Sequence, residues 1–84
     1  MSYALEILRS AQKQLAHIDR HDQLRIITAI RSLADEPHPA GSKKLSGRDA
    51  WRIRVGTYRI IYEIQHDRLL VVVVSIGHRR EVYR

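Results

Sequence analysis

Residues 51–62, WRIRVGTYRIIY, give the clearest indication of how this chain folds. Apolar and polar side chains alternate on both sides of Gly56-Thr57, which predicts two antiparallel strands joined by a two-residue turn in which glycine supplies the positive φ. This turn sets a register whose facing pairs are Val55 with Tyr58, Arg54 with Arg59, Ile53 with Ile60, and Trp51 with Tyr62. One face of the hairpin is therefore apolar and aromatic, and we expect it to pack against helices.

The opposite face of the hairpin carries Arg52, Arg54 and Arg59, together with Ile61 and Glu63. Two arginines directly opposite each other repel by about 0.2–1 kcal/mol, and a bound anion relieves that repulsion. Solvation is the simplest explanation for an isolated arginine on a sheet. Three arginines within one hairpin favour a phosphate-binding site over that explanation.

The rest of the chain supplies the partners of this hairpin. The apolar run LLVVVV, residues 69–74, predicts a strand in the middle of the sheet. Helical spacing of apolar residues predicts one helix capped by Ser10 and a second that begins near Asp19 to Asp22 and stops at Pro37. We expect one α+β domain over residues 1–84, of order β-α-α-β-β-β. A helical hairpin packs on one face of a mostly antiparallel four-stranded sheet, which is followed by a short basic tail. The expected strands cover residues 2–8, 50–55, 58–64 and 68–76.

Length and composition limit the class of protein. A chain of 84 residues with 44% hydrophobic residues has material for a single core. It contains no cysteine, which excludes disulfides, thiolate metal sites and cysteine nucleophiles. No apolar run approaches the roughly 20 residues that cross a bilayer, so we expect a cytoplasmic protein without a membrane partner. The histidines lack a second ligand at metal spacing, and no zinc site is expected.

The positive charge is concentrated in the second half of the chain. The formal net charge is +6, yet basic and acidic residues balance over residues 1–42. All of the excess follows Gly41 and is mostly arginine, the side chain suited to forked phosphate contacts. This asymmetry is typical of a surface that binds a polyanion, although a basic surface kept for solubility is the alternative. The candidate RNA-binding residues are Lys43, Lys44, Arg48, His78 and Arg80.

The C-terminal segment GHRREVYR, residues 77–84, contains the group types that an RNA-cleaving site needs. Tyr83 can stack on a base, arginine can stabilise a phosphorane, and histidine is the residue type best suited to accept or donate a proton near neutral pH, a role open to His78. We expect this tail to fold across the strand ends beside the arginine-bearing face. The structural alternatives are a core or interface anchor for Tyr83 and an ordinary surface histidine for His78.

Four strings together resemble the RelE/ParE toxin superfamily, and the tail resembles its RelE-like branch: KLSG at 44–47, WRIRVG at 51–56, YRIIY at 58–62 and GHRREVY at 77–83. The resemblance implies a type II toxin–antitoxin toxin that cleaves messenger RNA on the ribosome. In that reaction the 2′-hydroxyl of the RNA attacks the adjacent phosphodiester and expels the 5′-oxygen, without a metal or cofactor. It also implies inhibition by a RelB-like antitoxin, in an assembly such as a toxin–antitoxin heterotetramer.

The same resemblance assigns roles by position. Arg52 and Arg54 match basic residues that hold the RNA and help to activate the 2′-oxygen, and Arg59 matches the arginine of the transition state. Arg79 matches the residue near the leaving oxygen, and Tyr83 matches the tyrosine that stacks on a base. Well-known members have lysines where this chain has Arg52 and Arg54.

That departure affects the assignment of proton transfer. A guanidinium keeps its proton at ordinary pH, so we assign both arginines to positioning and electrostatic stabilisation. His78, Glu81 and Glu63 are the candidate proton acceptors. His78 is chemically the easier donor to the leaving group, whereas Arg79 is the better positional match.

Two other functions remain open from the sequence. A ParE-like toxin that inhibits DNA gyrase would have the same fold without nuclease activity, but it has no chemical need for the arginine hairpin and the HRREVY tail. A non-catalytic nucleic-acid-binding module would account for the charge. The absence of a recognised DNA- or RNA-reading motif argues against it. For the antitoxin, an acidic or amphipathic segment that covers the basic face is expected.

Overall fold

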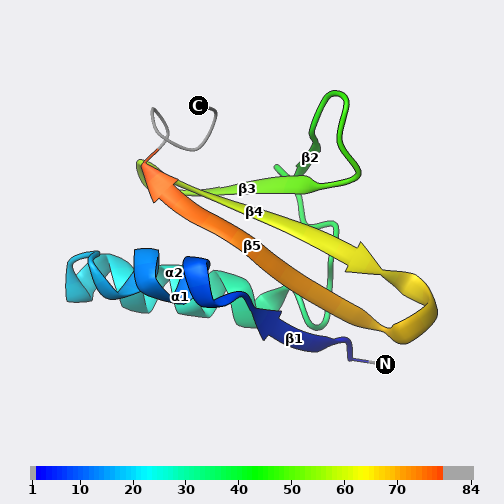
Figure 1. The fold of residues 1–84 in the computed structure, drawn as a ribbon, viewed down its shortest axis with the longest axis horizontal. Helices are drawn as coiled ribbons and strands as arrows, with labels where there is room; N and C mark the ends of the chain where they lie inside the picture. Colours follow the sequence, from blue (N-terminus) through cyan, green and yellow to red (C-terminus); the bar gives the residue numbers. More distant parts are fainter. Residues whose placement is uncertain (1, 79–84) are drawn as a thin grey trace.

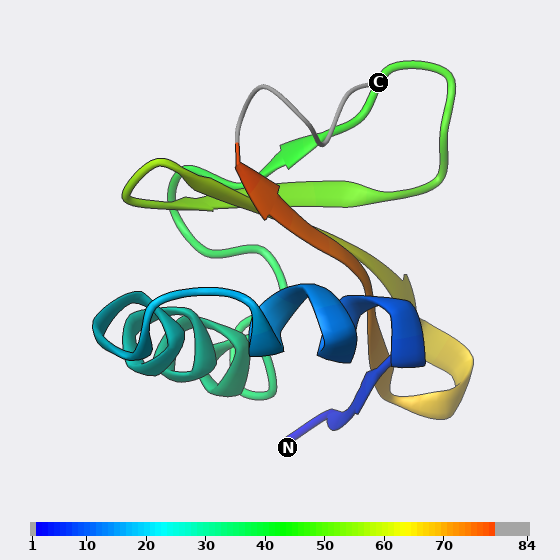
Figure 2. The same ribbon diagram turned by 60° about the vertical axis from the view of Figure 1, so that its left-hand side comes forward.

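A computed structural model describes residues 2–78 of the chain (Figure 1). The elements in chain order are β1 (Ala4–Ile7), α1 (Arg9–Ala16), α2 (Arg20–Ser32), β2 (Lys43–Lys44), β3 (Trp51–Val55), β4 (Tyr58–Gln65), the 3-10 helix η1 (His66–Arg68) and β5 (Leu70–His78). Both helices lie on one side of the sheet in Figures 1 and 2, which confirms the expected α+β architecture. No helix within residues 2–78 is both long and apolar enough to span a bilayer.

The sheet has five strands in the order β1-β5-β4-β3-β2, one more than the sequence predicts. The additional strand is β2, in which Lys43 pairs with Arg52 and Lys44 with Trp51. Two adjacent lysines show no alternation of apolar and polar residues, and the sequence pattern therefore gives no sign of a strand. β1 runs parallel to β5, and the other neighbours are antiparallel.

The β3–β4 hairpin has the register that the sequence predicts, with Trp51 opposite Tyr62 and Arg54 opposite Arg59. Gly56 has a φ of 60° at the turn, as a two-residue hairpin loop requires. Side chains of Ile53, Ile60 and Tyr62 contribute to the core on the helix side of the sheet. Their buried partners there include Ala11, Ile26, Ile30, Leu33, Val71, Val73 and Ile76.

The helix boundaries differ in part from the prediction. Asp19 caps α2 by accepting a hydrogen bond from the backbone N–H of His21 at 3.2 Å. The Ser10 cap is wrong, because α1 begins at Arg9 and its N-cap, Leu8, provides no side-chain hydrogen bond. Helix α2 ends at Ser32 and is followed by turns, so the helix ends before Pro37 and not at that residue. The Pro37 carbonyl instead accepts a hydrogen bond from the buried Tyr62 hydroxyl at 2.7 Å, which ties the connector to the sheet.

An irregularity in β5 changes which side chains share a face. Ile61 pairs with Ser75, but the next residue of β4, Tyr62, pairs with Val73, so Val74 is an extra residue in β5. Such a β-bulge reverses the alternation of the strand beyond it. Val73 and Ile76 consequently both face the helices, although they are three positions apart.

Helix α1 covers the edge of β5 beyond the end of β1. β1 pairs only with residues 70–73 of β5. Further along the strand, the backbone N–H of Ile76 donates to Oε1 of Gln14 at 2.8 Å. The Gln14 side chain of α1 thus accepts a hydrogen bond from a backbone N–H of β5. A longer β1 would otherwise have paired with that N–H.

Candidate phosphate-binding face

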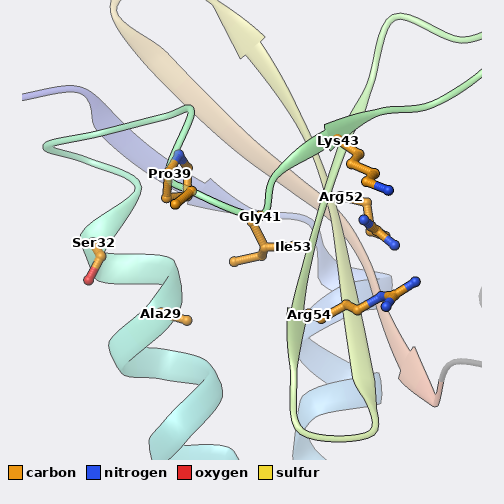
Figure 3. Close-up of a pocket in the computed structure, with 9 residues that line it drawn as sticks. Ala29, Ser32, Pro39, Gly41, Lys43, Arg52, Ile53 and Arg54 are labelled. Carbon is orange, nitrogen blue, oxygen red and sulfur yellow. The ribbon is translucent and has the colours of Figure 1, made fainter.

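The sheet surface turned away from the helices carries Arg52, Arg54 and Arg59, and is named here the arginine face. Residues that pair across strands project to the same side of a sheet. Arg52 therefore shares this surface with Lys43 and Ile61, and Arg54 shares it with Arg59. In Figure 3 the side chains of Lys43, Arg52 and Arg54 point away from α2, whereas Ile53 points toward it. The predicted gathering of the three hairpin arginines on one face is thus found, and Lys43 joins them.

Arg52 is the most unusual of these residues, because only 5% of its surface is exposed. Its Nε is buried and has no hydrogen-bond partner within the described part of the chain. Burial of a guanidinium costs free energy unless an anion pairs with it. The residue paired with Arg52 on the neighbouring strand β2 is another cation, Lys43. This arrangement favours binding of an anion such as a phosphate.

Arg54 and Arg59 form the next row of the same face. Arg54 is exposed, Arg59 is half-buried, and the position beside Arg59 on β5 is Gly77, which has no side chain. Two guanidinium groups that face each other on neighbouring strands can hold the two sides of one phosphate by forked hydrogen bonds. The pair therefore has a geometry that an anion stabilises.

The basic residues of the β2–β3 connection extend this positive surface only in part. Lys43 lies beside Arg52 on the arginine face. Lys44 pairs with Trp51, so its side chain projects to the opposite side of the sheet. Nζ of Lys44 lies 3.9 Å from the carboxylate of Asp49, an exposed pair that contributes little to stability. Arg48 is exposed in the loop, which extends away from the helices in Figures 1 and 2.

His78, at the end of β5, does not lie with the arginines. It pairs with Tyr58, and the two rings make an edge contact with centroids 6.0 Å apart. Tyr58 packs against the core, so His78 is on the helix side of the sheet. The expectation that His78 lies beside the arginine face is therefore wrong. The cause is the bulge at Val74, which the sequence pattern does not reveal.

Four predicted tail residues, Arg79, Arg80, Glu81 and Tyr83, lie outside the described residues. Their roles stay predictions. Glu63 is half-buried two positions from Ile61 on β4, which places it on the arginine face. Within residues 2–78, no group of three histidine or acidic side chains is arranged to hold a metal ion.

Sequence reasoning missed one polar residue of this face. Ser75 pairs with Ile61 and therefore projects to the same side as Arg52. From its spacing alone it is most simply a packing residue. The available signal was a single hydroxyl in the apolar strand LVVVVSIGH.

A hollow of about 520 Å³ lies on the helix side of β3. It is lined by Ala29 and Ser32 of α2, by the connector Pro39-Ala40-Gly41 and by Ile53. Lys43, Arg52 and Arg54 also border it, but their side chains point the other way in Figure 3. The cationic groups therefore do not converge in this hollow.

Comparisons with known proteins agree with this architecture. Residues 5–83 match a family model described as the ParE toxin of type II toxin–antitoxin systems, parDE. The toxin RelG of Mycobacterium tuberculosis is 27% identical over 88 residues, covering 100% of this chain and 99% of the relative. The archaeal RelE–RelB complex of Pyrococcus horikoshii contains a chain of similar fold, with a TM-score of 0.85 and 25% identity over 98% of this chain and 100% of the other. A chain of the RelBE2 toxin–antitoxin complex of Mycobacterium tuberculosis has the same fold, with a TM-score of 0.84 and 23% identity over 94% of this chain and 100% of that one.

Proposed function

The chain belongs to the ParE toxin family of type II toxin–antitoxin systems, within the RelE/ParE superfamily, and from this premise we propose that it is a ribosome-dependent endoribonuclease that cleaves messenger RNA. The observation that carries the proposal is the arginine face, where a buried Arg52 and the opposed pair Arg54 and Arg59 favour a bound phosphate. Similarity to the RelE of Pyrococcus horikoshii and to RelG supports placement in the RelE-like branch.

In the proposed reaction, the 2′-oxygen of a nucleotide attacks the adjacent phosphorus and the bond to the 5′-oxygen breaks. Arg52 and Arg54 hold the phosphodiester by charge-assisted hydrogen bonds. Arg59 meets the negative charge that develops on the phosphorane, which is the kind of interaction that lowers a barrier most effectively. Tyr83 stacks on a neighbouring base and Arg79 acts near the leaving oxygen, as the superfamily resemblance implies.

The proton of the 2′-hydroxyl requires an acceptor. Arg52 and Arg54 are unsuitable because a guanidinium does not give up its proton at ordinary pH. The placement of His78 on the helix side of the sheet argues against that residue. Glu63 lies on the arginine face, and we propose Glu63 or Glu81 as the acceptor.

We also propose that an antitoxin covers the arginine face. The related toxin of Pyrococcus horikoshii was solved as a RelE–RelB complex. A basic face on which the buried Nε of Arg52 has no hydrogen-bond partner among residues 2–78 suits an acidic or amphipathic segment, because opposite charge speeds association and offsets the cost of burial.

A second candidate function is inhibition of DNA gyrase, which is favoured by the match of the chain to the ParE toxin family. Both functions would arrest growth, so they must be separated by target. We would induce the chain in a bacterial host without its antitoxin, and then measure translation, DNA supercoiling and new 5′ ends on messenger RNA by primer extension. Arrested translation with new ends on ribosome-bound messages supports the endoribonuclease. Continued translation with collapsed supercoiling overturns it in favour of gyrase inhibition.

A further inference from the structure

Ser75 lies on the arginine face in the same row as Arg52. It pairs with Ile61, which in turn pairs with Arg52, so the three residues form one row across β5, β4 and β3. The next row contains Gly77, Arg59 and Arg54. Ser75 is therefore a diagonal neighbour of Arg59 on the same surface, at the spacing of about 7–8 Å that long side chains bridge.

The bulge at Val74 is what turns Ser75 to this face. Val73 faces the helices and pairs with Tyr62. In a regular strand the residue two positions later would face the helices as well. The extra residue reverses the alternation and directs the Ser75 hydroxyl to the arginine face. Bulges that re-aim a side chain in this way occur preferentially next to active sites.

The Ser75 hydroxyl has no evident structural task. It stands in a strand whose other residues up to Ile76 are apolar, and it is half-buried. Within residues 2–78 it makes no hydrogen bond, in contrast to Ser32, whose hydroxyl donates to the Thr28 carbonyl. Among the described residues its oxygen is not one of the buried polar atoms that lack a partner, so the hydroxyl is accessible from solvent. A ligand on the arginine face can therefore reach it.

We propose that Ser75 is a phosphate-contacting residue, whose hydroxyl donates a hydrogen bond to a non-bridging oxygen of the RNA phosphodiester bound by Arg52, Arg54 and Arg59. This inference rests on the endoribonuclease function proposed above. The hydroxyl adds a short, directional contact to the long guanidinium side chains and fixes the phosphate in the orientation that in-line attack by the 2′-oxygen requires.

The test compares Ser75→Ala, which removes the hydroxyl, with Ser75→Thr, which retains it. Ser10→Ala is the matched control, since Ser10 is exposed on α1 and away from the arginine face. Single-turnover cleavage of ribosome-bound messenger RNA and thermal melting are measured on the same preparations. Loss of one hydrogen bond to a charged oxygen corresponds to a decrease in cleavage rate of about 10- to 100-fold. We expect that decrease for Ser75→Ala with an unchanged or higher melting temperature, near wild-type cleavage for Ser75→Thr, and no effect for the control.

A substrate with sulfur in place of a non-bridging oxygen at the scissile phosphate shows whether the Ser75 hydroxyl contacts that oxygen directly or affects cleavage indirectly. Sulfur accepts hydrogen bonds weakly, so one of the two phosphorothioate isomers should slow the wild-type protein more than it slows Ser75→Ala. If both proteins respond equally to both isomers, or if Ser75→Ala cuts within twofold of the wild type, the Ser75 contact is refuted. If the wild-type protein itself cuts no ribosome-bound RNA, the endoribonuclease proposal fails instead, and the two failures are thereby distinguished.

Discussion

Arg54 lies directly opposite Arg59 across the β3–β4 ladder, so two like charges occupy one cross-strand pair. Stability and function are therefore expected to oppose each other on this face. In a sheet selected for stability alone, one of these positions would carry an acidic or neutral side chain. The unfavourable pair is consistent with binding of a phosphate between the strands.

Replacement of Arg59 by alanine should separate stability from activity. The substitution relieves the repulsion with Arg54 but also removes the other interactions of the Arg59 side chain, so the melting temperature should change little. Cleavage should fall by about 10²–10³, the usual cost of losing one group that stabilises transition-state charge. Both quantities are measured on the same preparation, with Arg9→Ala on the exposed start of α1 as the control. A destabilised variant with full activity would mean that Arg59 is a structural residue.

Removal of Tyr83 and Arg84 should lower cleavage while the protein remains folded. The core of residues 2–78 is built by the two helices and by strands that end by His78, so we expect the domain to fold without these two residues. Stacking of a base on an aromatic ring contributes about 1–3 kcal/mol, which corresponds to a decrease of roughly ten- to a hundredfold. Circular dichroism measures whether the truncated protein is folded, and primer extension measures its cleavage of messenger RNA. Normal cleavage would remove Tyr83 from the site, and loss of folding would identify it as an anchor.

Tyr62→Phe should destabilise the protein by about 1–3 kcal/mol, because it leaves the buried Pro37 carbonyl without its hydrogen-bond donor. Tyr58→Phe is the matched control, since the Tyr58 hydroxyl makes no hydrogen bond within residues 2–78. Urea unfolding with an unchanged m-value measures the difference. Equal stabilities of the two variants would contradict the role of Tyr62 in fixing the connector between α2 and β2.

Alkaline pH should unfold the protein through the same residue. Burial raises the pKa of Tyr62 above its ordinary value of 10.0, the nearby Glu36 carboxylate raises it further, and a hydrogen bond with Ser42 lowers it in part. The folded state then binds a proton that the unfolded state releases. The stabilising effect is thus complete below pH 10 and is lost as the pH rises through the raised pKa. Unfolding free energies measured from pH 8 to 11 should fall less steeply for Tyr62→Phe than for the wild type. Parallel curves would show that Tyr62 is not the titrating group.

The hairpin at the centre of the site could be predicted because its register depends on local chemistry. Gly56-Thr57 permits one turn type, and the alternation on both sides then fixes which side chains share a face. The cross-strand pairing of Arg54 with Arg59 can therefore be predicted from the sequence alone. The fold class follows from the same periodicity, extended to the two helices and the apolar last strand.

The features that escaped prediction depend on contacts between distant parts of the chain. The extra residue Val74 is accommodated by the pairing of β5 with β4, and nothing in a run of four valines marks which one will bulge. The sequence therefore predicts the wrong side of the sheet for His78, and it gives no sign that Ser75 lies on the arginine face. Strand β2 forms only because Lys43 and Lys44 reach the edge of β3, and α1 begins at Arg9 without any side-chain cap at Leu8.

The parallel pairing of β1 with β5 has a consequence for the timing of folding. Residues 4–7 emerge from a translating ribosome long before their partners at 70–73. Strand β5 must also insert between β1 and β4 before the sheet is continuous. Contacts between segments that are distant in the sequence make folding slow. Here they also mean that folding cannot be completed before β5 has been synthesised. The nascent chain therefore cannot present a complete arginine face while most of the domain is still being made, so the ribosome that synthesises this toxin is not exposed to the finished site until β5 has emerged.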